Sequence, residues 1–206
     1  MLPRRSLMMN YRTTALNRPT KIELGSGPHG EPGFLHVDVV KVGNVDIEAD
    51  IRDLRWLEDN SVDELYSSHT VEHISYAEIE DVLSEWCRVL KPEGKMTIKM
   101  PDLDFLCRAY VEGIHSTEEI MVAIFGGFSD YPGGPDGWEK ISGNPRWERN
   151  SIPDGRIPHP GHYTEWGAHK ALYTFESFKP RLERAGFKDV KRVVENDWEL
   201  YITASK

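Results

Sequence analysis

Three glycines near the N-terminus have the spacing of a nucleotide-binding loop. Gly25, Gly27 and Gly30 follow a short apolar strand expected at residues 21–24, and they fit the pattern G-x-G-x-x-G. Such a turn lets backbone N–H groups approach a ligand closely. The pattern alone is shared by several classes of ligand, so the residues around it decide which ligand the loop suits.

The connection that follows the loop is too short for a dinucleotide site. Asp38 comes soon after Gly30, and Pro28, Pro32 and Gly33 interrupt the segment, so a full helix cannot fit between them. The helix N-terminus that would hold a pyrophosphate is therefore largely missing. S-adenosylmethionine suits the loop better, because it has no phosphate and presents a sulfonium, an ammonium, a carboxylate and a ribose diol.

Acidic residues near the ends of successive expected strands match these polar groups. Glu23, just before the glycines, suits the ammonium group, while the loop amides suit the carboxylate. Asp38 ends the strand expected at 34–40 and can accept both ribose hydroxyls, and Asp50 follows the strand expected at 45–49 and can reach the adenine amino group. Ligands of open α/β sheets bind at the carboxyl ends of strands. The alternative for any one of these acids is a simple turn cap.

A second group of reactive residues has the pattern H-x-x-E-H. His69, Glu72 and His73 match, in reversed order, the motif of zinc proteases, which need both histidines on one helical face and a third ligand downstream. The motif lies where a strand expected at 62–67 meets a helix expected at 75–90. We assign no metal ligands from the sequence, and a zinc hydrolase that uses these three residues remains an alternative.

The stretch from 126 to 170 has no sustained hydrophobic period and is rich in glycine, proline, aromatic residues and histidine. A loop this long in a compact domain is usually functional or disordered, and the aromatic residues argue against plain disorder. We expect an acceptor site here, with His162 or His169 as a candidate general base, because imidazole titrates near neutral pH. A packed aromatic lid with ordinary surface histidines is the alternative for the whole cluster, which also includes His159, Tyr163, Trp166 and Lys170.

The elements that must position these residues alternate between strand and helix. Further elements are a strand at 95–100, helices at 103–111, 117–125 and 174–186, and two final strands at 187–194 and 198–204. Only three residues separate the last two strands, which predicts an antiparallel hairpin. The order predicts an α/β fold with an open, mostly parallel, seven-stranded Rossmann-like sheet and helices on both faces.

Size and charge agree with a single enzyme domain. The chain has 206 residues and a formal net charge of -9, which disfavours general nucleic-acid or membrane-surface binding. Residues 1–20 carry four arginines and no acid; we expect a flexible tail before a domain at 21–206, with a transit peptide as the alternative. Cys87 and Cys107 lie in apolar helical patterns and are expected in the core, which suits a reducing, cytoplasmic location.

Four stretches of the chain resemble the class I S-adenosylmethionine-dependent methyltransferases. They are IELGSGPHGEPGFLHVDVV, DIEADIRDL, NSVDELYSSHTVEHI and EWCRVLKPEGKMTIKMPDLDFL. The similarity extends over about residues 21–106 and is nearest to the small-molecule or sugar-type branch, whose first helix is abridged in the same way. Near the C-terminus, the stretch TFESFKPRLERAGFKDV resembles the last helix and sixth strand of the family.

The resemblance implies a role for each candidate site residue. The implied contacts are Glu23, Gly25, Ser26 and Gly27 to the methionine part, Asp38 to the ribose, Asp50 and Ile51 to the adenine, and Ser68 and His69 near the methyl group. Gly30 is expected to shape the turn and not to contact the cofactor.

The acceptor implied is an oxygen or nitrogen of a small molecule or sugar-type compound. The candidate bases are His69, His73, His162 and His169. The chain lacks an Asp/Asn-Pro-Pro-aromatic motif and a Pro-Cys pair, which argues against two classes of DNA-base methyltransferase. A non-catalytic nucleotide-binding partner subunit is the remaining alternative.

Overall fold

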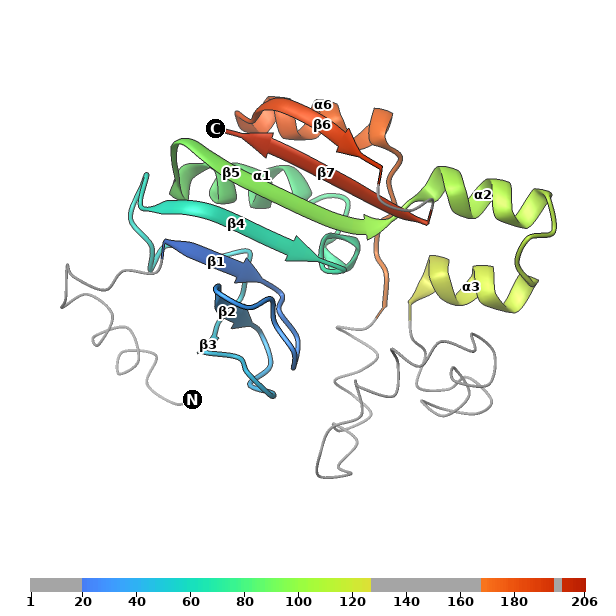
Figure 1. Cartoon of the computed structure of the whole chain (residues 1–206), viewed down its shortest axis with the longest axis horizontal. Helices are drawn as coiled ribbons and strands as arrows, with labels where there is room; N and C mark the ends of the chain where they lie inside the picture. Colours follow the sequence, from blue (N-terminus) through green and yellow to red (C-terminus); the bar gives the residue numbers. More distant parts are fainter. Residues whose placement is uncertain (1–19, 127–167, 195–197) are drawn as a thin grey trace.

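The computed structural model describes residues 20–126, 168–194 and 198–206, which build a seven-stranded sheet (Figure 1). The strands are β1 (Lys21–Leu24), β2 (Leu35–Asp38), β3 (Ile47–Glu48), β4 (Val62–Ser68), β5 (Leu90–Pro101), β6 (Lys188–Val193) and β7 (Glu199–Ser205). Their order is β3-β2-β1-β4-β5-β7-β6. All pairs of neighbouring strands within β1–β5 are parallel, whereas β7 is antiparallel to both β5 and β6. The predicted open Rossmann-like sheet with an antiparallel C-terminal hairpin is confirmed.

Helices follow the carboxyl ends of β4 and β5. They are the short 3-10 helix η1 (Val71–His73), α1 (Ile79–Val89), α2 (Leu103–Val111), α3 (Thr117–Phe125) and α6 (Phe175–Ala185). Helices α1 and α6 pack against each other behind the sheet, while α2 and α3 pack together beyond the end of β5 (Figure 1). In the part of the chain that the structure describes, no helix is long and apolar enough to cross a membrane.

The two faces of the sheet differ in polarity. The paired row Ile22, Leu65, Met96 and Ala204 is buried on the face that α1 and α6 cover. The neighbouring row Lys21, Glu64, Lys95 and Ser205 points to the opposite face and is partly or fully exposed. Strands that alternate in this way can leave one face solvated. Within the described ranges, α1 and α6 therefore cover one face, and the row on the other face is left partly or fully exposed.

Helix ends follow local sequence signals in one case and depart from them in another. Thr174 and Ser177 form a reciprocal capping box at the start of α6, and Gly186 ends that helix with φ 105°, as these residue types commonly do. Ser75 does not cap α1, because the helix begins at Ile79 and the Ser75 hydroxyl accepts from the N–H of Ala77 instead.

The two cysteines differ in burial. Cys87 is buried as expected, whereas Cys107 is exposed. Leu106 and Ala109 form the buried side of α2, so the prediction that Cys107 lies in the core is wrong.

Candidate active site

The glycine loop lies between the ends of β2 and β4. The N–H groups of Gly25 and Ser26 donate to the carbonyl of Val37 over 2.8 and 3.3 Å, and the Thr70 hydroxyl lies 3.1 Å from the Gly25 carbonyl oxygen. Gly25 and Gly27 have φ of 73° and 57°, a region that favours glycine. The loop is therefore fixed from both sides by neighbouring strand ends.

Asp38 faces this loop from the end of β2. Its Oδ2 accepts from the N–H of Gly27 at 2.9 Å, and its Oδ1 accepts from the N–H of Val40 at 3.0 Å. Each carboxylate oxygen retains acceptor capacity for a further donor. The arrangement suits the predicted contact with a ribose diol.

Glu23 lies under the β1–β2 connection. It is paired with His36 on the neighbouring strand and is only 4% exposed. Its carboxylate accepts from the N–H of Glu31 and lies 3.6 Å from His36 Nε2. Burial raises the pKa of Glu23 above its ordinary value. A contact between Glu23 and the ammonium group remains a prediction.

The residues predicted to hold adenine are anchored near α1. Asp50 accepts from the Nε of Arg52 at 3.0 Å and from its terminal nitrogen at 2.7 Å. Burial alone would raise the pKa of Asp50, but the hydrogen bonds from Arg52 outweigh burial and lower it. The carbonyl of Ile51 accepts from the indole N–H of the buried Trp86 at 2.9 Å. These contacts fix the carboxylate of Asp50 and the backbone of Ile51.

His69 lies immediately after β4 and meets the start of β7. Its Nε2 is 2.8 Å from Glu199 Oε1, and its ring stacks on Trp198 with 5.8 Å between centroids. Burial alone would lower the pKa of His69, but the carboxylates of Glu199 and Glu72 outweigh burial and raise the pKa to about 9. The protonated ring is therefore favoured at neutral pH, and a role for His69 as general base remains a prediction.

No motif in the sequence indicated Trp198 or Glu199. They reach the site because β7 runs antiparallel to β5, with Glu199 opposite Pro101, so the start of β7 lies at the edge of the sheet where β5 ends. The sequence predicted the C-terminal hairpin, but it did not indicate which strand of the sheet the hairpin would pair with.

Two further histidines surround a buried carboxylate. Glu72 is fully buried, and His169 Nε2 lies 3.9 Å from its Oε1. The ring centroids of His73 and His169 are 4.9 Å apart. Burial alone would raise the pKa of Glu72, but the surrounding histidines outweigh burial and lower it. The structure thus brings together His69, His73 and His169.

The remaining loop candidates, His159, His162, Tyr163 and Trp166, lie outside the described residues. The reversed zinc-protease geometry is not formed by the H-x-x-E-H residues, because η1 spans only Val71–His73 and His69 precedes it. The two histidines of the motif therefore do not share one helical face.

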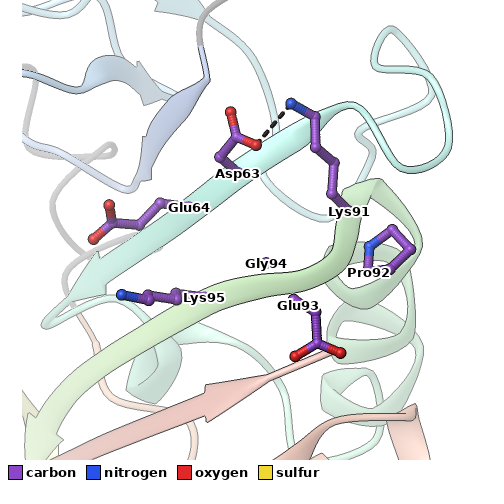
Figure 2. A pocket seen from close by; sticks show the side chains of 7 residues that line it. All are labelled: Asp63, Glu64, Lys91, Pro92, Glu93, Gly94 and Lys95. Atoms are coloured by element: carbon purple, nitrogen blue, oxygen red, sulfur yellow. Dashed lines mark hydrogen bonds and ion pairs between the residues drawn. The ribbon is translucent and has the colours of Figure 1, made fainter.

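An open pocket lies at the other end of the sheet (Figure 2). It is lined by Asp63, Glu64 and the Lys91–Lys95 turn, and Asp63 pairs with Lys91 at 2.7 Å. Ligands of open α/β sheets bind at the carboxyl ends of strands, so we place the candidate active site at the opposite edge.

Comparisons with known proteins bear on the family and the fold. The family model described as "Methyltransferase domain" matches residues 31–98, about a third of the chain. No curated protein sequence matches the chain.

Solved structures share the fold at low sequence identity. An S-adenosylmethionine-dependent methyltransferase from Archaeoglobus fulgidus has a TM-score of 0.52 and 16% identity, with 97% of this chain and 91% of that chain covered. A methyltransferase from Thermotoga maritima, described as a possible histamine N-methyltransferase, has a TM-score of 0.51 and 15% identity, with coverage of 97% and 87%. A putative methyltransferase from Listeria monocytogenes has a TM-score of 0.51 and 17% identity, with 92% of both chains covered. The chain thus matches a methyltransferase domain over residues 31–98 and shares the fold of these methyltransferase structures over most of its length.

Proposed function

We propose that the protein transfers the methyl group of S-adenosylmethionine to an oxygen or nitrogen of a small-molecule or sugar-type acceptor. The observation that carries the proposal is the meeting of the glycine loop, Asp38 and His69 at one edge of the sheet. Asp38 accepts from the N–H of Gly27, and Thr70, next to His69, lies against Gly25. These contacts support one site in which the glycine loop and Asp38 lie near His69.

In this site the cofactor's methionine part would lie against the Gly25–Gly27 loop, its ribose against Asp38 and its adenine near Asp50 and Ile51. Ser68 and His69 would then face the methyl group. Methyl transfer needs an acceptor lone pair in line with the sulfonium, and positioning can lower such a barrier by about 7–11 kcal/mol.

Acceptor choice is assigned to the segment between residues 126 and 170. Its two described ends meet beside the histidines, since Gly126 pairs with Ala168 and the His169 N–H donates to the Phe125 carbonyl at 3.0 Å. His169, one of the two candidate bases of this segment, therefore lies at the site, whereas His162, the other, lies outside the described residues.

Two measurements test the proposal. Calorimetry should detect binding of S-adenosylhomocysteine and none of NADH; NADH binding without S-adenosylhomocysteine binding would overturn it. A panel of hydroxyl and amine acceptors should then yield S-adenosylhomocysteine in the presence of S-adenosylmethionine. Cofactor binding with no turnover over a broad panel would favour a non-catalytic subunit.

A further inference from the structure

Glu72, His73 and His169 place three ligand atoms within 4.8 Å of one another. Imidazole nitrogen with one carboxylate is a donor set that suits Zn²⁺ and other divalent transition metals. We propose that these three residues bind one such ion, with Zn²⁺ as the reference, and leave its other positions to water or a further ligand. The inference goes beyond methyl transfer and does not depend on which acceptor is used.

The two imidazoles are oriented as metal ligands. His73 Nδ1 lies 3.2 Å from the Ala168 carbonyl oxygen, and His169 Nδ1 lies 3.0 Å from that of Ala123. A carbonyl oxygen can only accept, so each Nδ1 carries a proton, and in the neutral ring the lone pair is then on Nε2. Metal-ligating histidines commonly donate their other ring N–H in this way.

The Glu72 side chain supplies an independent observation. It is 1% exposed, and neither carboxylate oxygen has a hydrogen-bond partner within the described ranges. Buried polar groups without partners are rare and unfavourable. An ion pair with His69, whose Nδ1 is 3.4 Å from Oε1, balances the charge but does not explain why His73 and His169 also converge here. A metal ion would satisfy the carboxylate and use both histidines.

The three ligand atoms, which lie within 4.8 Å of one another, must draw closer together to bind one ion. Zinc bonds of about 2.0–2.2 Å place tetrahedral ligands roughly 3.3–3.6 Å apart, and His169 Nε2 is already 3.9 Å from Glu72 Oε1. The N–H groups of Lys170 and Ala171 donate to the Glu72 carbonyl at 2.7 and 3.2 Å. These bonds hold the two ligand-bearing segments together.

Metal binding can be measured on the full chain, expressed without a polyhistidine tag. The purified protein should contain about one equivalent of transition metal by mass spectrometry. After removal by a chelator, Zn²⁺ should bind with one-to-one stoichiometry by calorimetry, and Co²⁺ should give a visible absorption band. Glu72→Gln, which is nearly isosteric, and His169→Ala should each weaken Zn²⁺ binding by about 100-fold or more.

A matched control is available at the surface. His115 lies 3.6 Å from Glu119 and is 41% exposed, so His115→Ala removes another histidine beside a carboxylate and should change Zn²⁺ affinity less than twofold. If His169→Ala fails to fold, the Glu72→Gln variant and the Co²⁺ spectrum still decide the question. Absence of saturable Zn²⁺ binding, or equal binding by Glu72→Gln and wild type, would overturn the metal site. S-adenosylhomocysteine binding by the chelator-treated protein tests the proposed function separately.

Discussion

Thr70 and Gly25 join the carboxyl ends of β4 and β1. A Cβ at Gly25 would lie 2.3 Å from both Oγ1 and Cγ2 of Thr70, and Gly25 also has a positive φ of 73°. Glycine is therefore required here for space as well as for conformation. The contact holds the glycine loop against the segment that carries His69.

Replacing Gly25 by Ala should impair both the fold and cofactor binding. The left-handed conformation costs about 1–2 kcal/mol for a residue with a side chain, and Thr70 must also move. We expect a lower Tm and a loss of S-adenosylhomocysteine affinity of about tenfold or more, measured by calorimetry. Gly27→Ala is the matched control, since it has φ 57° but no atom within 4 Å of its Cβ. Equal losses in both variants would show that the Thr70 contact has no role.

Asp38→Ala should weaken binding of S-adenosylmethionine and S-adenosylhomocysteine by about 2–4 kcal/mol, because it removes a charged acceptor from the diol and from the Gly27 N–H. Titration calorimetry measures the change. Asp63→Ala, an exposed acid paired with Lys91 at the opposite end of the sheet (Figure 2), should leave the affinity unchanged. If Asp38→Ala binds the cofactor with wild-type affinity, Asp38 only caps a turn and does not contact the ribose.

His36 should make stability depend on pH. Its ring nitrogens lie 2.9 and 3.2 Å from the carbonyl oxygens of Glu31 and Asn44, and only the charged ring can donate to both. Burial alone would lower the pKa of His36, but these carbonyls and the nearby carboxylates outweigh burial and raise it. Because the folded pKa exceeds the unfolded value of about 6.5, this stabilisation is full below that pH and is lost as the pH rises through the folded pKa.

Denaturant unfolding of wild type and His36→Gln between about pH 5.5 and 9 measures this effect, with the pH range set around the unfolded histidine pKa. The wild type should lose more free energy of unfolding than the variant as the pH rises. The difference in slope is the readout, because Gln also alters the contact between the ring and Gly30. Parallel pH profiles would contradict the prediction.

Local signals in the sequence were enough for several elements. The bounds of α2 and α3 agree with the predicted helices, and α6 (Phe175–Ala185) lies within its predicted range of 174–186, whose end residues Thr174 and Gly186 are its caps. These features depend on residues within a few positions of one another, where capping and helical periodicity act. The glycine loop and Asp38 were also predictable, because strand order alone brings their ends together.

Other features depend on contacts between distant segments. His69 meets Glu199 across 130 positions of sequence, and the burial of Glu72 depends on the docking of residues 168–171. The pattern H-x-x-E-H offered His69 and His73 as a pair for the alternative of a zinc hydrolase, whereas the spatial cluster contains His73 and His169. Neither a motif nor a hydrophobic period records such pairings.

Glu199 should act by positioning His69 near the methyl group. Its carboxylate and the stacked Trp198 fix the ring, so Glu199→Ala should lower kcat on the order of 10–100-fold through loss of alignment. Cofactor affinity should stay within about twofold, since Glu199 is not among the predicted cofactor contacts. Glu199→Gln keeps an acceptor oxygen for the ring and should recover part of the rate, a rescue that a merely structural role would not give.

Glu112→Ala, at the exposed end of α2, is the control. A wild-type kcat in Glu199→Ala would mean that Trp198 and the backbone hydrogen bond to Lys99 suffice to hold His69, and the positioning role would be withdrawn.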